Sequence, residues 1–119
     1  MQLFISRGRT IAVYPCYRVE LEKIAKKLST GRLRIAGPWI FEIDFINGKP
    51  VCAIGVDPRG NFFYGDKALL HLKKIYSKER DRYFLEIIQL SEKQILIDKE
   101  CAPQSIVKHP ELLLGEKKP

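Results

Sequence analysis

The side chains that could bind a transition metal are few and widely spaced. Histidine occurs only at His71 and His109, and neither has a second histidine or a cysteine at ligand spacing. Cysteine occurs at Cys16, Cys52 and Cys101, an odd number with no C-x-x-C pair. Structural zinc is usually held by closely spaced pairs of these residue types. The sequence therefore predicts no metal, no cofactor and no disulfide framework.

Three carboxylates, Glu42, Asp44 and Asp57, are the candidate ligands for Mg²⁺, which prefers oxygen. With Arg59, they loosely resemble the acid and acid-x-Lys motif of the PD-(D/E)xK nucleases, with Asp for Glu and Arg for Lys. Strand geometry separates Asp44 from Asp57 by roughly 20 Å, or about 13 Å for a longer turn, too far to share an ion. Asp57 is also a favoured first residue of a type I turn. A metal-dependent nuclease is therefore the third interpretation.

Motifs for other kinds of catalysis do not occur. The serines lack a G-x-S-x-G context, and neither G-x-x-x-x-G-K nor G-x-G-x-x-G is found. The chain also lacks the His-hydrophobe-His pair by which rolling-circle initiators and relaxases hold their metal. We therefore expect a protein that binds a partner without catalysing a reaction.

Positive charge is the strongest functional signal. The chain has a net charge of +7, and residues 1–40 hold eight basic against two acidic side chains. Such an excess attracts polyanions, so the leading interpretation is a small protein that binds the phosphates of DNA or RNA, more weakly as salt rises. The candidate contact residues are Arg7, Arg9, Lys23, Lys26, Lys27, Arg32, Arg34, Lys67, His71, Lys74 and Lys78.

These candidates have two kinds of setting. The lysines and His71 lie on the outer faces of two amphipathic helices, where charged side chains are ordinary. The arginines flank a glycine turn or follow the first helix, and a guanidinium fits phosphate bidentately. The nucleic-acid interpretation depends on whether the second helix's lysines lie beside the arginines in space. If the two groups face opposite sides, the interpretation loses its basis.

Apolar alternation and turn motifs predict most of a sheet. Asn47-Gly48 favours a hairpin that places Asp44 opposite Val51, which puts Cys52 and Ile54 on the same core face as the odd-numbered aromatic residues. By the same parity Phe63 points to the other face, where it would form a stacking platform or a docking surface, or be covered by a helix. Strands are expected at residues 3–5, 10–14, 82–90 and 94–98, and in a three-stranded meander at 39–64.

Two amphipathic helices complete the expected fold. Apolar residues recur at helical spacing in 17–29 and in 67–79, and Asp66 is a good N-cap for the second helix. The predicted fold class is α+β, a single domain with a mainly antiparallel sheet of about six to seven strands and two helices packed on it.

The end of the chain is less regular. We expect residues 1–100 to form the compact domain and 101–119 a C-terminal extension that is partly ordered or used in assembly, with one helical turn after Pro110 and a frayed end at 116–119. This suggests the second interpretation, a homo-oligomeric assembly protein, expected to be a homodimer, that buries the Phe63 face or the Leu112–Leu114 tail.

The composition also bears on where the protein is found. No apolar run reaches the ~18–20 residues of a membrane span, and the first residues do not resemble a secretory signal. We therefore expect a cytoplasmic protein without membrane contact. Abundant Lys, Glu and Ile with few Asn and Gln is a bias of thermophile proteins.

Overall fold

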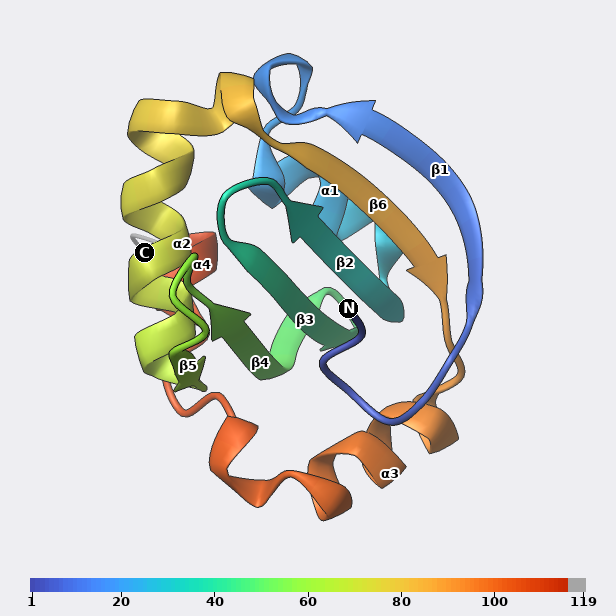
Figure 1. The fold of residues 1–119 in the computed structure, drawn as a ribbon. Helices are drawn as coiled ribbons and strands as arrows, with labels where there is room; N and C mark the ends of the chain where they lie inside the picture. Colours follow the sequence, from blue (N-terminus) through green and yellow to red (C-terminus); the bar gives the residue numbers. More distant parts are fainter. Residues whose placement is uncertain (116–119) are drawn as a thin grey trace.

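An antiparallel sheet of six strands runs through the centre of the computed structural model, which describes residues 1–115 (Figure 1). The strand order is β1-β6-β2-β3-β4-β5, so β1 and β5 form the two edges. The strands are β1 (Arg9–Pro15), β2 (Gly31–Ala36), β3 (Ile40–Ile46), β4 (Lys49–Val56), β5 (Phe62–Tyr64) and β6 (Phe84–Gln89). The predicted α+β class and antiparallel sheet are confirmed.

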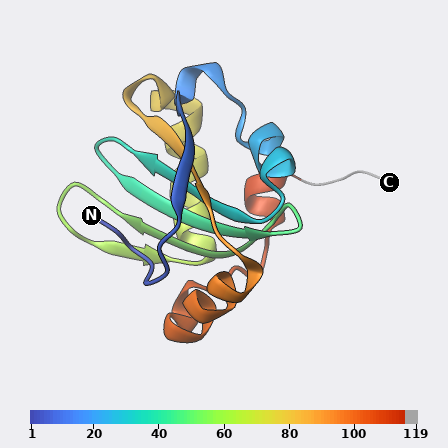
Figure 2. The ribbon, with the colours of Figure 1, turned by 90° about the vertical axis from the view of Figure 1, so that its right-hand side faces the viewer.

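Three helices form a layer on one face of the sheet. They are α1 (Leu21–Leu28), α2 (Asp66–Glu79) and α4 (Glu111–Leu114). Figure 2 shows the sheet from the side, with α1 and α4 on one side and the N-terminus on the other. The helix α3 (Glu92–Cys101) lies at the end of the sheet, where its residues join those of the N-terminal segment on the face opposite the helical layer. We call this opposite face the charged face, after the residues described below.

The core lies between the helical layer and the sheet. Leu33, Phe41 and Leu85, on three adjacent strands, are fully buried there. The predicted apolar stripe of α2 is confirmed, because all its members are buried: Ala68, Leu69, Leu72, Ile75 and Tyr76.

A β-bulge at Val51 reverses the predicted faces of the meander. The turn closes as expected, with Ile46 opposite Lys49, but the register then shifts and Asp44 pairs with Cys52 instead of Val51. One extra residue exchanges the two faces of a strand. As a result Cys52 and Ile54 share a face with Asp44, and the prediction that they lie beside the odd-numbered aromatic residues is wrong.

Phe63 therefore belongs to the core face. Its ring stacks on Trp39 with centroids 5.4 Å apart, and it packs against the core. Gly55 lies opposite Phe41, and a Cβ there would come within 2.8 Å of the Phe41 ring. The small residue makes room for an aromatic core side chain. Of the alternatives for Phe63, its contact with His71 of α2 fits cover by a helix and not a free platform.

Two predicted strands are also wrong. Residues 94–98 belong to α3, which begins with a capping box in which the Ser91 and Gln94 side chains bond each other's backbone N–H. Residues 3–5 form no strand, because the N–H groups of Leu3 and Phe4 are bound by the Glu42 carboxylate instead of by a neighbouring strand.

The first helix is shorter than predicted. Residues 16–18 form a 3₁₀ turn, and α1 begins only at Leu21. The Tyr76 hydroxyl shares its single proton between the backbone carbonyls of Cys16 and Val19, at 3.0 and 2.7 Å. Because the Tyr76 hydroxyl occupies these carbonyls, the chain stays extended at Val19 and Glu20.

The C-terminal segment packs against the domain as far as the structure describes it. The Val107 N–H donates to the Val51 carbonyl at 2.9 Å, and Leu113 is buried between the helices. A helical turn begins after Pro110, as predicted. The expected frayed end, 116–119, lies outside the described residues. Within residues 1–115, none of the helices combines the length and apolar composition needed to cross a membrane.

Candidate functional site

Charged side chains gather on the face of the sheet that the helical layer leaves free. The register places Arg32 opposite Asp44, and Arg34 between Glu42 on β3 and Glu86 on β6. These pairs point to one face because alternate residues of neighbouring strands share a side. Residues 1–6 and α3 cover part of this face. This cover buries three charged side chains, Arg32, Glu42 and Asp44.

Arg32 is the centre of this network. Its side chain is 2% exposed, with Nε 2.7 Å from Asp44 Oδ1 and Nη2 2.7 Å from Asp98 Oδ2. Its Nη1 donates to the Ser6 carbonyl at 2.8 Å. All three guanidinium nitrogens are thus occupied within the protein. The predicted role of Arg32 as a phosphate contact is therefore corrected, because its guanidinium is out of reach of any polyanion at the surface.

Asp44 and Asp98 are two buried carboxylates that both bind Arg32. Asp44 Oδ2 is buried and has no N–H or hydroxyl partner among residues 1–115. Burial, together with the hydrogen bond to Asp98, raises the pKa of Asp44 to about 8. Burial alone would raise the pKa of Asp98 too, but hydrogen bonds from Asp44 and Ser6 and the charge of Arg32 outweigh it and lower that pKa. The raised pKa means that Asp44 keeps its proton at neutral pH.

This proton makes the free energy of unfolding depend on pH. Between pH 3.8 and about 8 the folded protein keeps the Asp44 proton that the unfolded chain has lost. Stability from this group is therefore complete below pH 3.8 and lost as the pH rises to about 8. In Asp44→Asn, which is neutral at every pH, this slope disappears. Urea unfolding of both proteins across this range checks the expectation, and parallel curves would contradict it.

Glu42 is likewise occupied. Its Oε1 accepts the N–H groups of Leu3 and Phe4 at 3.1 and 3.0 Å, and its Oε2 pairs with Arg34, which is 16% exposed. Asp57 Oδ1 accepts hydrogen bonds from the N–H groups of Arg59 and Asn61. It therefore closes the turn that the sequence predicted it to begin. No three or more His, Cys, Asp or Glu in the part of the chain that the structure describes are arranged to hold a metal ion. The nuclease interpretation gains no support from these carboxylates.

The predicted basic residues separate onto different surfaces. Exposed lysines of α1 and α2 lie on the helical layer: Lys23, Lys26, Lys27, Lys67, Lys74 and Lys78. Arg7 and Arg34 line a hollow of about 320 Å³ on the charged face, with Arg32 at its floor. Arg9 lies on the edge strand β1 and donates to the Gln89 side chain. The lysines and the arginines thus do not form one surface, which removes the condition on which the nucleic-acid interpretation depended.

His71 is not a free surface residue either. Its ring lies 4.3 Å from the Phe63 ring and 5.0 Å from the Trp39 ring, measured between centroids. The side chain is half-buried in this aromatic cluster. Its expected position on the solvent side of α2 is therefore corrected, and its ring serves the packing of α2 on the sheet.

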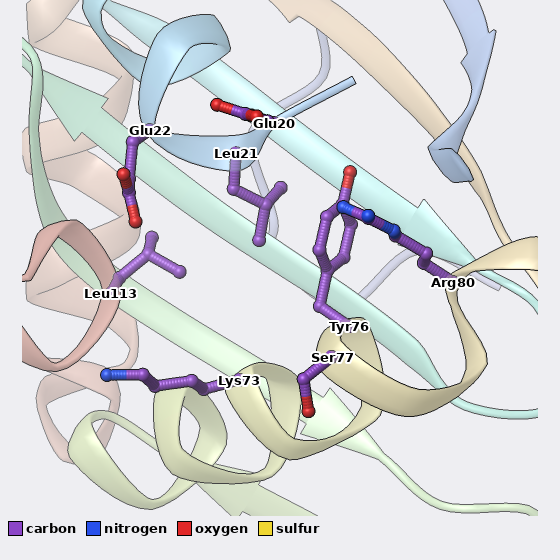
Figure 3. Close-up of a pocket in the computed structure, with 8 residues that line it drawn as sticks. All are labelled: Glu20, Leu21, Glu22, Lys73, Tyr76, Ser77, Arg80 and Leu113. Carbon is purple, nitrogen blue, oxygen red and sulfur yellow. The ribbon is translucent and has the colours of Figure 1, made fainter. Parts of the chain in front are cut away.

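A hollow of about 300 Å³ lies between α1 and α2 (Figure 3). Glu20 and Glu22, at the start of α1, lie across it from Lys73 on α2 and Arg80 in the turn after α2. These four side chains are all exposed, and the Tyr76 hydroxyl in the wall is already bonded to two carbonyls. The hollow therefore presents opposite charges to solvent, and the tyrosine hydroxyl in its wall is not free to act as a nucleophile.

Asp66 holds the C-terminal segment to the start of α2. Predicted as an N-cap, it is instead the first residue of the helix, and its Oδ1 accepts the N–H groups of Lys108 and His109, each at 3.0 Å. Its Oδ2 lies 2.8 Å from His109 Nδ1. This hydrogen bond and the charge of Asp66 raise the pKa of His109 above 6.5.

This contact predicts the titration of His109. In Asp66→Asn the carboxylate charge is gone, so the pKa of His109 should fall back toward 6.5. The contribution of the pair to stability is complete below pH 6.5 and is lost as the pH rises through the raised pKa. NMR titration of the histidine rings measures the pKa, with His71 as the internal control, and urea unfolding across the same pH range measures the stability. An unchanged His109 pKa in the variant would show that the contact does not persist in solution.

The β1 end of the sheet exposes apolar side chains. Val13 is 59% exposed, Ile11 52% and Tyr14 41%, and Phe84 on the adjoining strand is 59% exposed. β1 is hydrogen-bonded only to β6 and leaves its other side free. Sequence reasoning identified the strand but not this surface, although the lack of charge between Arg9 and Arg18 was a readable signal. We call these four side chains and the free side of β1 the β1 edge.

Comparisons with protein-family models, with curated proteins and with solved structures find no match for this chain. A functional assignment therefore depends on the residues of the chain itself. Among the surfaces of residues 1–115, the charged network is closed by its own bonds, and the β1 edge combines the longer free edge strand with four exposed apolar side chains.

Proposed function

We propose that this protein acts by self-association, without catalysing a reaction, and that copies of the chain contact one another at the β1 edge. The observation that supports this proposal is the exposure of Ile11, Val13, Tyr14 and Phe84 beside a strand with one free side. An exposed apolar edge strand is a ready template for pairing with another chain, and natural proteins usually protect such edges with charges. β1 carries a charge only at its first residue, Arg9.

The opposite edge of the sheet is a useful contrast. β5 has only three residues, and the segment between Ile106 and Leu114 runs close to the strands and helix next to it. Short edge strands resist pairing because they offer few backbone groups. The two edges therefore differ in the feature that promotes association, and the proposal assigns the contact to β1 rather than to the Phe63 face or the leucine tail.

Sedimentation equilibrium over a wide range of protein concentration tests the proposal. Two copies that each carry +7 repel one another, so association should strengthen as salt screens the charges. Binding of a polyanion would show the opposite dependence on salt. A chain that stays monomeric at high concentration in both low and high salt would contradict self-association.

Nucleic-acid binding through the lysines alone, without the arginines, is a second candidate, on one observation. α1 and α2 lie in the same layer, and each carries exposed lysines. Fluorescence anisotropy with DNA and RNA oligonucleotides tests it. We expect affinity to fall steeply with salt and to fall further when Lys23, Lys26 and Lys27 are replaced by alanine. Replacement of the exposed Lys93 on α3, away from this layer, serves as the control.

A further inference from the structure

From the direction of its backbone groups, we infer that β1 pairs antiparallel with β1 of a second copy, with Val13 opposite the partner's Val13. This inference rests on the proposed self-association and specifies its register. Figure 2 looks onto the free side of β1, and no other segment lies in front of it. The partner at such an edge must be an extended segment, because only a strand can fill a row of free N–H and C=O groups.

The backbone of β1 decides which residues face the partner. The N–H of Cys16 donates to the Tyr83 carbonyl at 2.9 Å, so residue 16 points toward β6. Backbone groups alternate along a strand, so Tyr14 also points toward β6, while Val13 and Pro15 point to the free side. Pro15 has no N–H to donate, and its outward position is the one where a proline leaves the bonds to β6 intact.

The bulge in β1 confines the pairing to its second half. The register with β6 shifts at Ile11, between Thr10 and Ala12, so the regular outward pattern begins at Val13. A pair centred on Val13 lets the two copies exchange both N–H···O bonds of that residue. It also places Ala12 opposite the partner's Tyr14, while the bulge at Ile11 and the missing N–H of Pro15 leave Val13 as the residue that exchanges backbone bonds.

Charge favours a second copy in this register over a different extended segment. Residues 10–17 carry no charge, so β1 meets its copy without an ion pair or a repulsive contact. Arg9 lies four residues from the axis, so the Arg9 residues of the two copies would be about 26 Å apart at ~3.3 Å per residue. The single charge of the strand is thereby kept away from its own copy, and the apolar side chains meet one another.

The two-fold axis of such a pair stands perpendicular to the sheet. Both helical layers then lie on one side, and the sheets of the two copies continue into each other. On the other side, Val13 and Phe84 of the two copies form one apolar strip across the axis. The arrangement buries the apolar side chains at the centre of the contact and leaves the lysine surfaces free.

Val13→Lys tests the contact. It places two ammonium groups across the axis, and like charges opposite each other on paired strands are unfavourable. We expect the dimer dissociation constant, measured by sedimentation equilibrium, to rise about tenfold or more. The matched control is Phe62→Lys, which adds the same charge at a 46% exposed residue of the other edge strand and should leave the dimer unchanged. An unchanged dimer in Val13→Lys, or equal loss in both variants, would overturn the inference. Unfolding in urea, measured on both variants, verifies that each still folds.

Disulfide trapping tests the register. In a Cys101→Ser background, Val13→Cys should form a covalent dimer on mild oxidation, because Cα atoms about 5.5 Å apart permit a disulfide. Arg9→Cys, at about 26 Å, should not. A dimer in sedimentation that traps at residue 9 but not at 13 overturns the register while the proposed function stands. A chain that is monomeric throughout overturns both.

Discussion

Replacing Arg32 by methionine should reduce the free energy of unfolding by about 3–5 kcal/mol. Among residues 1–115, the change removes the only cation that contacts the buried carboxylates of both Asp44 and Asp98. The remaining charge on Asp98 would then lie in a site with 0% exposure and without a counterion. Burying a charge without a partner costs several kcal/mol, far more than the pair contributes when both members are present. Urea unfolding at pH 7 measures the loss.

Two further variants make this expectation specific. Arg7→Met removes an exposed arginine from the same face and should change stability by less than about 0.5 kcal/mol. Combining Arg32→Met with Asp98→Asn removes the uncompensated charge and should restore part of the loss. If Arg32→Met behaves like Arg7→Met, the network is not buried in solution as the structure describes it.

Leu113→Ala should reduce the free energy of unfolding by about 2–5 kcal/mol. Leu113 is 5% exposed and belongs to the core cluster formed by α1, α2 and the sheet. The truncation leaves a cavity between helices that contact each other through this side chain. This expectation replaces the earlier interpretation of the leucine tail as an assembly surface, because a side chain buried in its own chain is not available to a second one.

The control for this prediction is Leu96→Ala. Leu96 lies on α3 and is 48% exposed, so its truncation should change stability by less than about 0.5 kcal/mol. Oligomeric state should stay the same in both variants at concentrations where the chain is folded. If Leu113→Ala dissociates an oligomer but leaves the unfolding midpoint unchanged, the tail is an assembly element after all.

Several elements could be predicted because their signals are local. Asn47-Gly48 closes the β3–β4 turn, and Asp57 closes the next turn through bonds to the N–H groups of Arg59 and Asn61. The apolar stripe of α2 was complete in the sequence. In each case the residues of the sequence motif are the same residues that form the contacts, and they lie within a few positions of each other.

The faces of the meander could not be predicted in the same way. They depend on one bulged residue, Val51, whose type gives no sign of its role. The sequence pattern alone places Glu42 and Asp44 on the outer side of a strand, where charged residues are normally exposed to solvent. Their burial depends on Ser6 and Asp98, which are 92 residues apart in the chain. No local pattern contains such a contact.

The start of α3 is a different case, because its signal was present. Ser91-Glu92-Lys93-Gln94 has the spacing of a capping box, yet the apolar residues that follow also suit a strand. Of the candidate site residues, the exposed lysines lie where amphipathic periodicity puts them. Arg32 and Arg34 do not lie where they were predicted. The alternation of side chains along a strand does not show which face of the sheet will be covered.

The hydrogen bond between Ser6 and Asp98 also bears on how the chain acquires its structure. It joins the first residues to a helix near the other end, and Arg32, from the middle of the sequence, bonds to both. Closing a loop of this length costs conformational entropy, so we expect these contacts to form late and the charged groups to stay hydrated until then. We expect the completed network to couple both ends of the polypeptide to one cooperative transition, so that the first residues, which fray in many domains, open together with the sheet.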